Sequence, residues 1–326
     1  MKIVFITYEF KYRTFSGNGV LAQSTIRGLE KKLSDDEIFV ICARPDDDDD
    51  DDDDDGMYAE EENVRIMSVR VPKQKWGKLD RSCAYEEFAN GLLDLAKLLE
   101  FNADVYMGVD WSSANAFKRI VEQNYPSSSS SPLPPLPPPP FVYLNYRVFT
   151  LHDDTHRKLE EEISQVADLV ICLCKTDAKF ISEQFKKSPI VVIHPPLRED
   201  VKTLADQQPK QNSTCGRRRN LLTCVVRLSE EKEPERFIEL VEHLAKIDAF
   251  NEDLVPILVA PSKTEYAEAL KKRFREATKT ISTQEEEQLV IEEFLDAKQL
   301  ADLYSRTKIN VHPCRKDGTC VFNIFF

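Results

Sequence analysis

Short apolar runs alternate with longer amphipathic segments over the first part of the chain. The runs predict strands at 2–7, 38–42, 64–69, 105–107, 141–144, 169–173 and 190–193. The longer segments predict helices at 20–32, 82–99, 112–123, 156–165 and 176–185. Within 82–99, apolar residues from Ala84 to Leu99 recur at helical spacing and fall on one face. This alternation predicts a parallel sheet covered by helices on both sides.

The pattern stops in a polar segment, 197–219, and then starts again. Further strands are expected at 221–226, 255–260, 288–291 and 309–311, with helices at 234–247, 264–277 and 296–305. The sequence therefore predicts an α/β protein with two Rossmann-like domains, 1–200 and 219–326, the second incomplete. Two such domains imply a cleft, where ligands bind at the carboxyl ends of strands.

Two low-complexity inserts, 46–56 and 126–140, interrupt the first domain. The first holds ten consecutive aspartates, Asp46 to Asp55, and the second is rich in serine and proline. Mutual repulsion and polyproline geometry predict disordered surface loops, with partner binding as the alternative. The net charge is −13, but without the aspartate run it is only about −3. The remaining body has no excess of basic residues, which disfavours nucleic-acid binding.

Other compositional features point to a cytoplasmic protein with reduced thiols. No apolar stretch is long enough to predict a membrane helix, and residues 1–10 read as a strand rather than a signal peptide. The eight cysteines are scattered along the chain. Cys172 and Cys174 are weak metal candidates because no second close pair of ligands accompanies them. His152 and His156 lie four apart but lack the glutamate of a zinc-protease motif, so they are interpreted as part of a helix start. No metal site is therefore expected.

Gly17-Asn18-Gly19 opens a stretch that matches G-x-G-x-x-A, a spacing found in dinucleotide sites. The first strand ends too far upstream for the tight turn of such a site. The second strand ends at Cys42-Ala43-Arg44, with no acidic residue in position to hold a ribose. The glycines also suit a helix start at which the backbone approaches an anionic ligand. A flexible loop without a ligand is the remaining alternative.

The segment from Val225 to Lys232 places Arg227 just past an apolar strand and Lys232 at the start of the next helix. Arginine offers a planar fork to phosphate oxygens and lysine a compact positive charge. Together they could neutralise a leaving diphosphate without a metal ion. The alternative is a pair of surface cations that bind the neighbouring Glu230, Glu231 or Glu233.

The Arg227-Leu-Ser-x-x-Lys232 segment resembles the donor-phosphate motif of glycosyltransferase family four, whose members have the GT-B fold. Residues 1–45, 167–172 and 300–314 resemble other parts of that family in the same order. The resemblance implies an N-terminal acceptor domain and a C-terminal domain that binds a nucleotide-diphosphate sugar as co-substrate, without a cofactor. It assigns the donor phosphates to Arg227, Lys232, Gly17 and Gly19, and the sugar to Asp317.

The sequence also departs from the family pattern. Asn145, Tyr146 and Arg147 stand where the family usually has a histidine, so no catalytic residue is identified. The second acidic residue of the sugar motif would fall at Phe325. We therefore expect a truncated hexosyltransferase-like chain with impaired transfer to an unknown acceptor. The alternatives are a non-catalytic nucleotide-sugar-binding or regulatory protein and, less favoured, a nicotinamide-dependent dehydrogenase.

Overall fold

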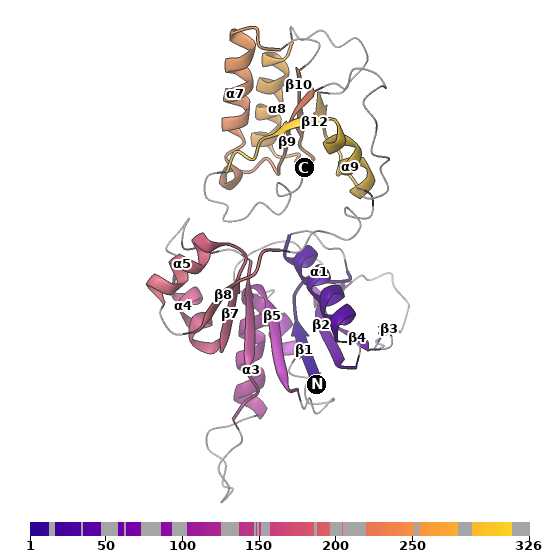
Figure 1. Ribbon diagram of the computed structural model, residues 1–326, viewed down its shortest axis with the longest axis vertical. Helices are drawn as coiled ribbons and strands as arrows, with labels where there is room; N and C mark the ends of the chain where they lie inside the picture. The colour runs from indigo at the N-terminus through magenta and orange to yellow at the C-terminus, as the bar shows by residue number, and fades with distance from the viewer. Residues whose placement is uncertain are drawn as a thin grey trace, which may run out of the picture. The chain divides into compact units, whose positions relative to one another are not determined.

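The computed structural model divides into two compact units, Met1–Pro196 (unit 1) and Leu197–Phe326 (unit 2) (Figure 1). The structure describes residues 1–12, 17–33, 35–46, 58–61, 63–72, 86–92, 103–124, 137–146, 148, 150, 157–185, 188–195, 204, 220–250, 254–279 and 289–314. Among these residues, no helix has the length and apolarity needed to cross a membrane.

Unit 1 is built on a sheet of eight strands, counted over its described residues, in the order β3-β4-β2-β1-β5-β6-β7-β8. The strands are β1 Lys2–Ile6, β2 Glu37–Asp46, β3 Tyr58–Glu61, β4 Val64–Pro72, β5 Val105–Val109, β6 Phe141–Asn145, β7 Leu169–Cys172 and β8 Ile190–Val192. Seven of them run parallel, and β3 pairs antiparallel with β4 at the edge. The carboxyl ends of the seven parallel strands therefore share one edge.

Helices cover both faces of this sheet. They are α1 Gly17–Lys32, α3 Asp110–Asn124, α4 Arg157–Val166 and α5 Lys175–Gln184. Ile3 and Phe5 of β1 pack with Leu21 of α1 in one core. Val4 and Ile6 belong to the other core, which also takes in the apolar sides of α3, α4 and α5. Alternate residues of β1 thus enter opposite cores, so both faces of the sheet are buried.

Unit 2 contains a smaller parallel sheet, with four strands among its described residues in the order β11-β10-β9-β12. The elements are β9 Asn220–Val225, the 3-10 turn η3 Glu230–Lys232, α7 Glu235–Lys246, β10 Leu254–Val259, α8 Glu265–Ala277, β11 Val290–Ile291, α9 Ala297–Ser305 and β12 Thr307–Asn310. Helices α7 and α8 lie side by side in Figure 1, and their Phe237 and Phe274 rings stack at 6.1 Å between centroids. Leu303 of α9 packs into the core on the opposite face.

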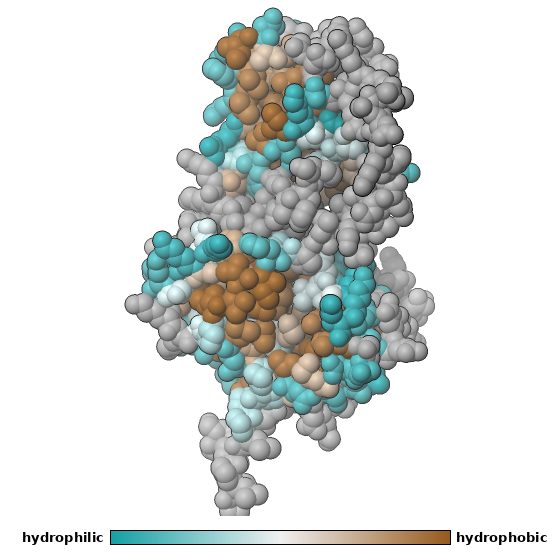
Figure 2. Space-filling view, viewed as in Figure 1, coloured by the Kyte–Doolittle hydropathy of each residue, from teal (hydrophilic) through white to brown (hydrophobic). Residues whose placement is uncertain are grey.

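These two sheets confirm the predicted α/β class and the alternation of strands and helices. In Figure 2 hydrophilic residues border hydrophobic ones on the visible face of each unit, as expected for amphipathic helices on a buried sheet. Each unit therefore has its own sheet and its own hydrophobic core.

Several predicted boundaries were wrong. Helix α1 begins at Gly17 instead of residue 20, and α3 begins at Asp110 instead of residue 112. Strand β2 extends to Asp46, which makes the first residue of the aspartate run part of the sheet. Strand β3 was not predicted. Of the helix expected at 82–99, the structure describes 86–92 as helical. Residues 47–56 and 126–136 of the two inserts lie outside the described residues.

Candidate functional site

The predicted phosphate-binding cations lie in the connection that follows β9 in unit 2. Arg227 is exposed, and Lys232 is half-buried at the end of η3 rather than in a longer helix. Two backbone hydrogen bonds fold this connection: Ser229 N–H donates to Arg227 O at 2.9 Å, and Lys232 N–H donates to Ser229 O at 2.9 Å. The two cations therefore lie on one compact turn at the carboxyl end of a central strand.

The Ser229 hydroxyl lies in the same turn. Its Oγ atom is buried and has no hydrogen-bond partner among the residues that the structure describes. Ser229 is also the N-cap of η3, but its side chain makes no capping hydrogen bond. A buried hydroxyl without a partner costs free energy, so this turn offers a donor that an oxygen-rich ligand could satisfy.

Two nearby carboxylates, Glu233 and Glu235, contact residues other than Arg227 and Lys232. Glu233 lies 3.9 Å from Arg236 of α7, and Tyr266 of α8 donates its hydroxyl to Glu235. Burial and the hydrogen bond to Glu235 raise the pKa of Tyr266, so the phenol stays protonated at neutral pH. Glu233 and Glu235 are thus engaged with side chains of α7 and α8, respectively.

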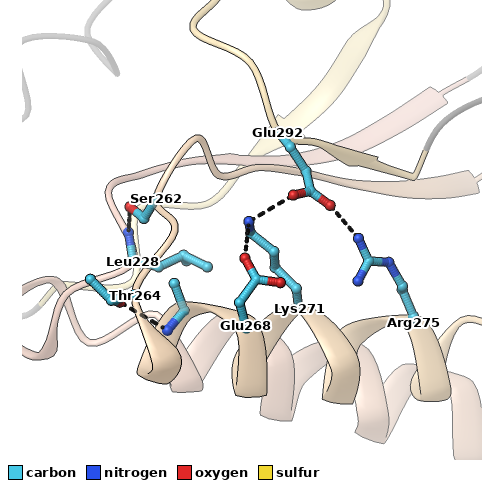
Figure 3. A network of polar contacts seen from close by, with 8 residues as sticks. Leu228, Ser262, Thr264, Glu268, Lys271, Arg275 and Glu292 are labelled. Atoms are coloured by element: carbon cyan, nitrogen blue, oxygen red, sulfur yellow. Dashed lines mark hydrogen bonds and ion pairs between the residues drawn. The ribbon is translucent and has the colours of Figure 1, made fainter.

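The next strand along the chain, β10 Leu254–Val259, ends beside this turn. Ser262, after β10, accepts a hydrogen bond through Oγ from Leu228 N–H at 3.2 Å and so ties the two connections together (Figure 3). The Thr264 side chain then caps α8 by accepting from Ala267 N–H. Carboxyl ends of parallel strands are where α/β sheets bind ligands. The turn with Arg227 therefore belongs to a connected edge formed by β9 and β10.

In unit 1, Gly17 and Gly19, which were predicted to bind donor phosphates, lie in the first turn of α1. Gly19 is buried, and a Cβ atom built on Gly17 would lie only 1.9 Å from the Tyr146 hydroxyl oxygen. A larger residue at position 17 would therefore force the ring of Tyr146, which follows β6, to shift. The structure places Gly17 and Gly19 in a different unit from Arg227 and Lys232.

Asp110 lies at the carboxyl edge of the unit 1 sheet, directly after β5, and the sequence analysis did not single it out. It links β5 to α3 with a left-handed backbone, φ 67°, and is 8% exposed. Its carboxylate accepts from Asn18 Nδ2 at 2.7 Å and from its neighbour Trp111 N–H at 2.8 Å. A non-glycine residue with this backbone conformation is strained and occurs often at functional sites. The signal in the sequence was an acidic residue directly after an apolar run.

The carboxylate of Asp110 lies beside the first turn of α1, which contains Gly17 and Gly19. Asn18 lies between the two glycines, so its hydrogen bond brings a negative charge to the first turn of α1. A helix N-terminus favours a carboxylate as it favours a phosphate. The assignment of donor phosphates to Gly17 and Gly19 stays a prediction.

The remaining sequence candidates are His152, His156, Asp317 and the cysteines Cys172 and Cys174. His152, His156 and Asp317 lie outside the described residues. Cys174 caps α5, its sulfur accepting from Asp177 N–H at 3.4 Å. Burial, with the charges of Asp177 and Cys174, raises the pKa of Cys172 to about 12. Among the described residues, no group of three or more His, Cys, Asp or Glu side chains is placed to hold a metal ion.

No family model and no curated protein sequence matches the chain. Solved structures do match it across 98% of its length. They include trehalose-6-phosphate synthase from E. coli bound to UDP-2-fluoro glucose, with a TM-score of 0.65 and 13% identity over 80% of that chain. A UDP-forming trehalose-phosphate synthase from Burkholderia vietnamiensis has a TM-score of 0.63 and 12% identity over 80% of its chain. A third, from Burkholderia xenovorans in complex with glucose-6-phosphate, has a TM-score of 0.62 and 13% identity over 81% of its chain.

These likenesses confirm the predicted GT-B fold, with an α/β sheet in each unit. Identities of 12–13% establish the fold alone. The similar structures are trehalose-phosphate synthases, so membership of glycosyltransferase family four is not confirmed.

Proposed function

We propose that this protein is a glycosyltransferase that uses a nucleotide-diphosphate sugar as donor. The observation that carries the proposal is the β9–α7 turn, which places Arg227, Lys232 and the Ser229 hydroxyl on one edge of a GT-B fold. The similar structures were solved as UDP-forming synthases, one of them with a UDP-sugar analogue bound, which supports a UDP-sugar as the donor to test first.

In this proposal the cations act on the leaving group. The bond between the sugar C1 and the diphosphate oxygen breaks, a new bond forms from C1 to an acceptor hydroxyl oxygen, and the hydroxyl proton is released. Negative charge grows on the diphosphate as it departs. Arg227 and Lys232 stabilise that charge more in the transition state than in the ground state, so they lower the barrier. The acceptor, and the residue that takes its proton, are open.

Binding of UDP by isothermal titration calorimetry is the first test. Charge-assisted hydrogen bonds contribute about 1.5–3 kcal/mol, so Arg227→Ala and Lys232→Ala should each weaken UDP binding roughly tenfold or more. Lys272→Ala removes an exposed cation of α8 and should leave the affinity unchanged. Equal UDP affinity in the wild type and both variants would contradict the proposal.

Turnover distinguishes the enzyme from a binding protein. We expect UDP to be released from UDP-glucose when a panel of sugars and sugar phosphates is supplied, and Arg227→Ala to lower that rate. Binding that depends on Arg227, without release for any acceptor, would favour the alternative of a non-catalytic nucleotide-sugar-binding protein.

A further inference from the structure

A run of four prolines, residues 137–140, lies directly before β6 and is the last part of the serine- and proline-rich insert. It belongs to no helix or strand. Pro137, Pro138 and Pro140 are exposed, and Pro139 is partly exposed. The proposed glycosyl transfer gives these surface rings no role, so they call for a separate explanation.

The sequence itself determines the conformation of this run. A proline ring holds φ at about −65°, and a residue that precedes a proline is confined to extended or polyproline values of ψ. Pro137, Pro138 and Pro139 meet both conditions, and none of the peptide bonds that the structure describes is cis. These constraints give the run the polyproline II form, with about three residues per turn. Pro137 and Pro140 are therefore one turn apart on the same side.

The carboxyl end of the run is fixed to the unit 1 sheet. Pro140 O accepts a hydrogen bond from Tyr106 N–H of β5 at 2.9 Å. Phe141 N–H, the next backbone group, donates to the Asp168 carboxylate at 2.8 Å. The buried Phe141 ring stacks on Phe117, with 4.4 Å between the ring centroids. The prolines thus project from a strand whose first residue is firmly held.

The run offers apolar rings and carbonyl oxygens to a partner. Proline has no backbone N–H, so the run cannot extend β6 as a hydrogen-bond donor. Among the described residues, no backbone N–H donates to the carbonyl oxygens of Pro137, Pro138 or Pro139. Protein modules with aromatic-lined grooves bind such segments, because the polyproline conformation is formed before binding and loses little entropy.

The position of the run in unit 1 leaves the opposite edge of the sheet open. Strand β6 is five residues long, so roughly 16 Å separates its amino end from its carboxyl end, the edge at which Asp110 lies. The strands on either side of β6 begin next to exposed carboxylates, Asp104 before β5 and Asp168 before β7. These negative charges favour a partner whose groove has a basic rim.

We propose that residues 137–140 are a docking segment for a protein module whose groove is lined with aromatic side chains and accepts a polyproline II helix. Pro137 and Pro140 supply the P-x-x-P pair that such grooves bind. The inference is independent of the proposed function, because the docking segment and the turn with Arg227 belong to different units.

The test measures binding of purified modules to the full chain by isothermal titration calorimetry. The panel is one SH3, one WW and one EVH1 domain, each with an established polyproline groove. We expect at least one of them to bind and a synthetic oligoproline peptide to compete with the chain. The double variant Pro137→Ala with Pro138→Ala should weaken that binding about tenfold or more, because two rings no longer fill the groove.

Pro189→Ala is the matched control. Pro189 is also exposed and precedes a strand at the same edge, β8, and its carbonyl oxygen accepts from Val170 N–H at 2.9 Å. It is a single proline outside any run, so its loss should leave binding unchanged.

Three results would overturn the inference. They are a wild type that binds no module of the panel, a double variant that binds as well as the wild type, and an equal loss of binding in Pro189→Ala. If the double variant does not fold, as judged by circular dichroism, Pro138→Ser replaces it under the same criteria.

Discussion

At the scale of single residues, two glycines of α1 should respond oppositely to the same substitution. Gly17→Ala places a methyl group against the Tyr146 hydroxyl, so we expect a loss of about 1–3 kcal/mol in the free energy of unfolding. Gly28 is an exposed helical residue whose added Cβ would meet nothing within 4 Å. Gly28→Ala should therefore stabilise the protein by about 0.5–1 kcal/mol. Urea unfolding measures both, and losses of equal size would contradict the close approach at Gly17.

A second residue-scale prediction concerns the thiols. The thiolate is the reactive form of cysteine, and Cys172 is fully buried with a pKa of about 12. Cys314 is only half-buried. During alkylation at pH 8, peptide mapping should show Cys314 modified well before Cys172, and denaturant should make both reactive. Early modification of Cys172 in the folded protein would contradict its burial.

At the scale of elements, the sequence predicted most helices and strands because apolar periodicity is strong in both units. The starts of α8 and α9 were placed to within a residue, since Thr264 and Asp296 are good N-caps. The start of α3 was missed because Asp110 has a left-handed backbone, which hydrophobic pattern does not encode. Strand β3 was missed because Tyr58–Glu61 has no alternating apolar pattern and depends on pairing with β4.

Lys271 and Arg275 of α8 form ion pairs with Glu292, which follows β11, and these pairs predict a pH dependence at this scale. The pKa of Glu292 is lowered in the folded protein, so the charged form contributes stability above the ordinary carboxyl pKa. That contribution is lost as pH falls through the lower, folded pKa. The difference in unfolding free energy between the wild type and Glu292→Gln should therefore shrink as pH is lowered from about 6 to 3. A difference that stays constant over this range would contradict the pairing.

At the scale of the whole molecule, the sequence predicted the GT-B fold from two runs of alternating elements and a short basic motif. What it could not supply was the ion-pair network between α8 and the segment after β11. Lys271, Glu292 and Arg275 come from separate positions along an ordinary amphipathic helix and a loop, and only the folded unit 2 brings their charges together. Asp110 and Asn18 likewise meet across 92 residues of sequence, a distance over which local pattern carries no information.

The last prediction uses ligand-linked stability to ask which unit holds the donor phosphates. UDP at a hundred times its Kd should stabilise the structure that binds it by about 2.7 kcal/mol. We expect amide hydrogen exchange to slow across β9, β10 and the 226–232 turn of unit 2, and Arg227→Ala to reduce the effect at the same UDP concentration. Slower exchange at residues 17–19 as well would support the predicted role of Gly17 and Gly19. No change anywhere in unit 2 would contradict the assignment of the phosphates to Arg227 and Lys232.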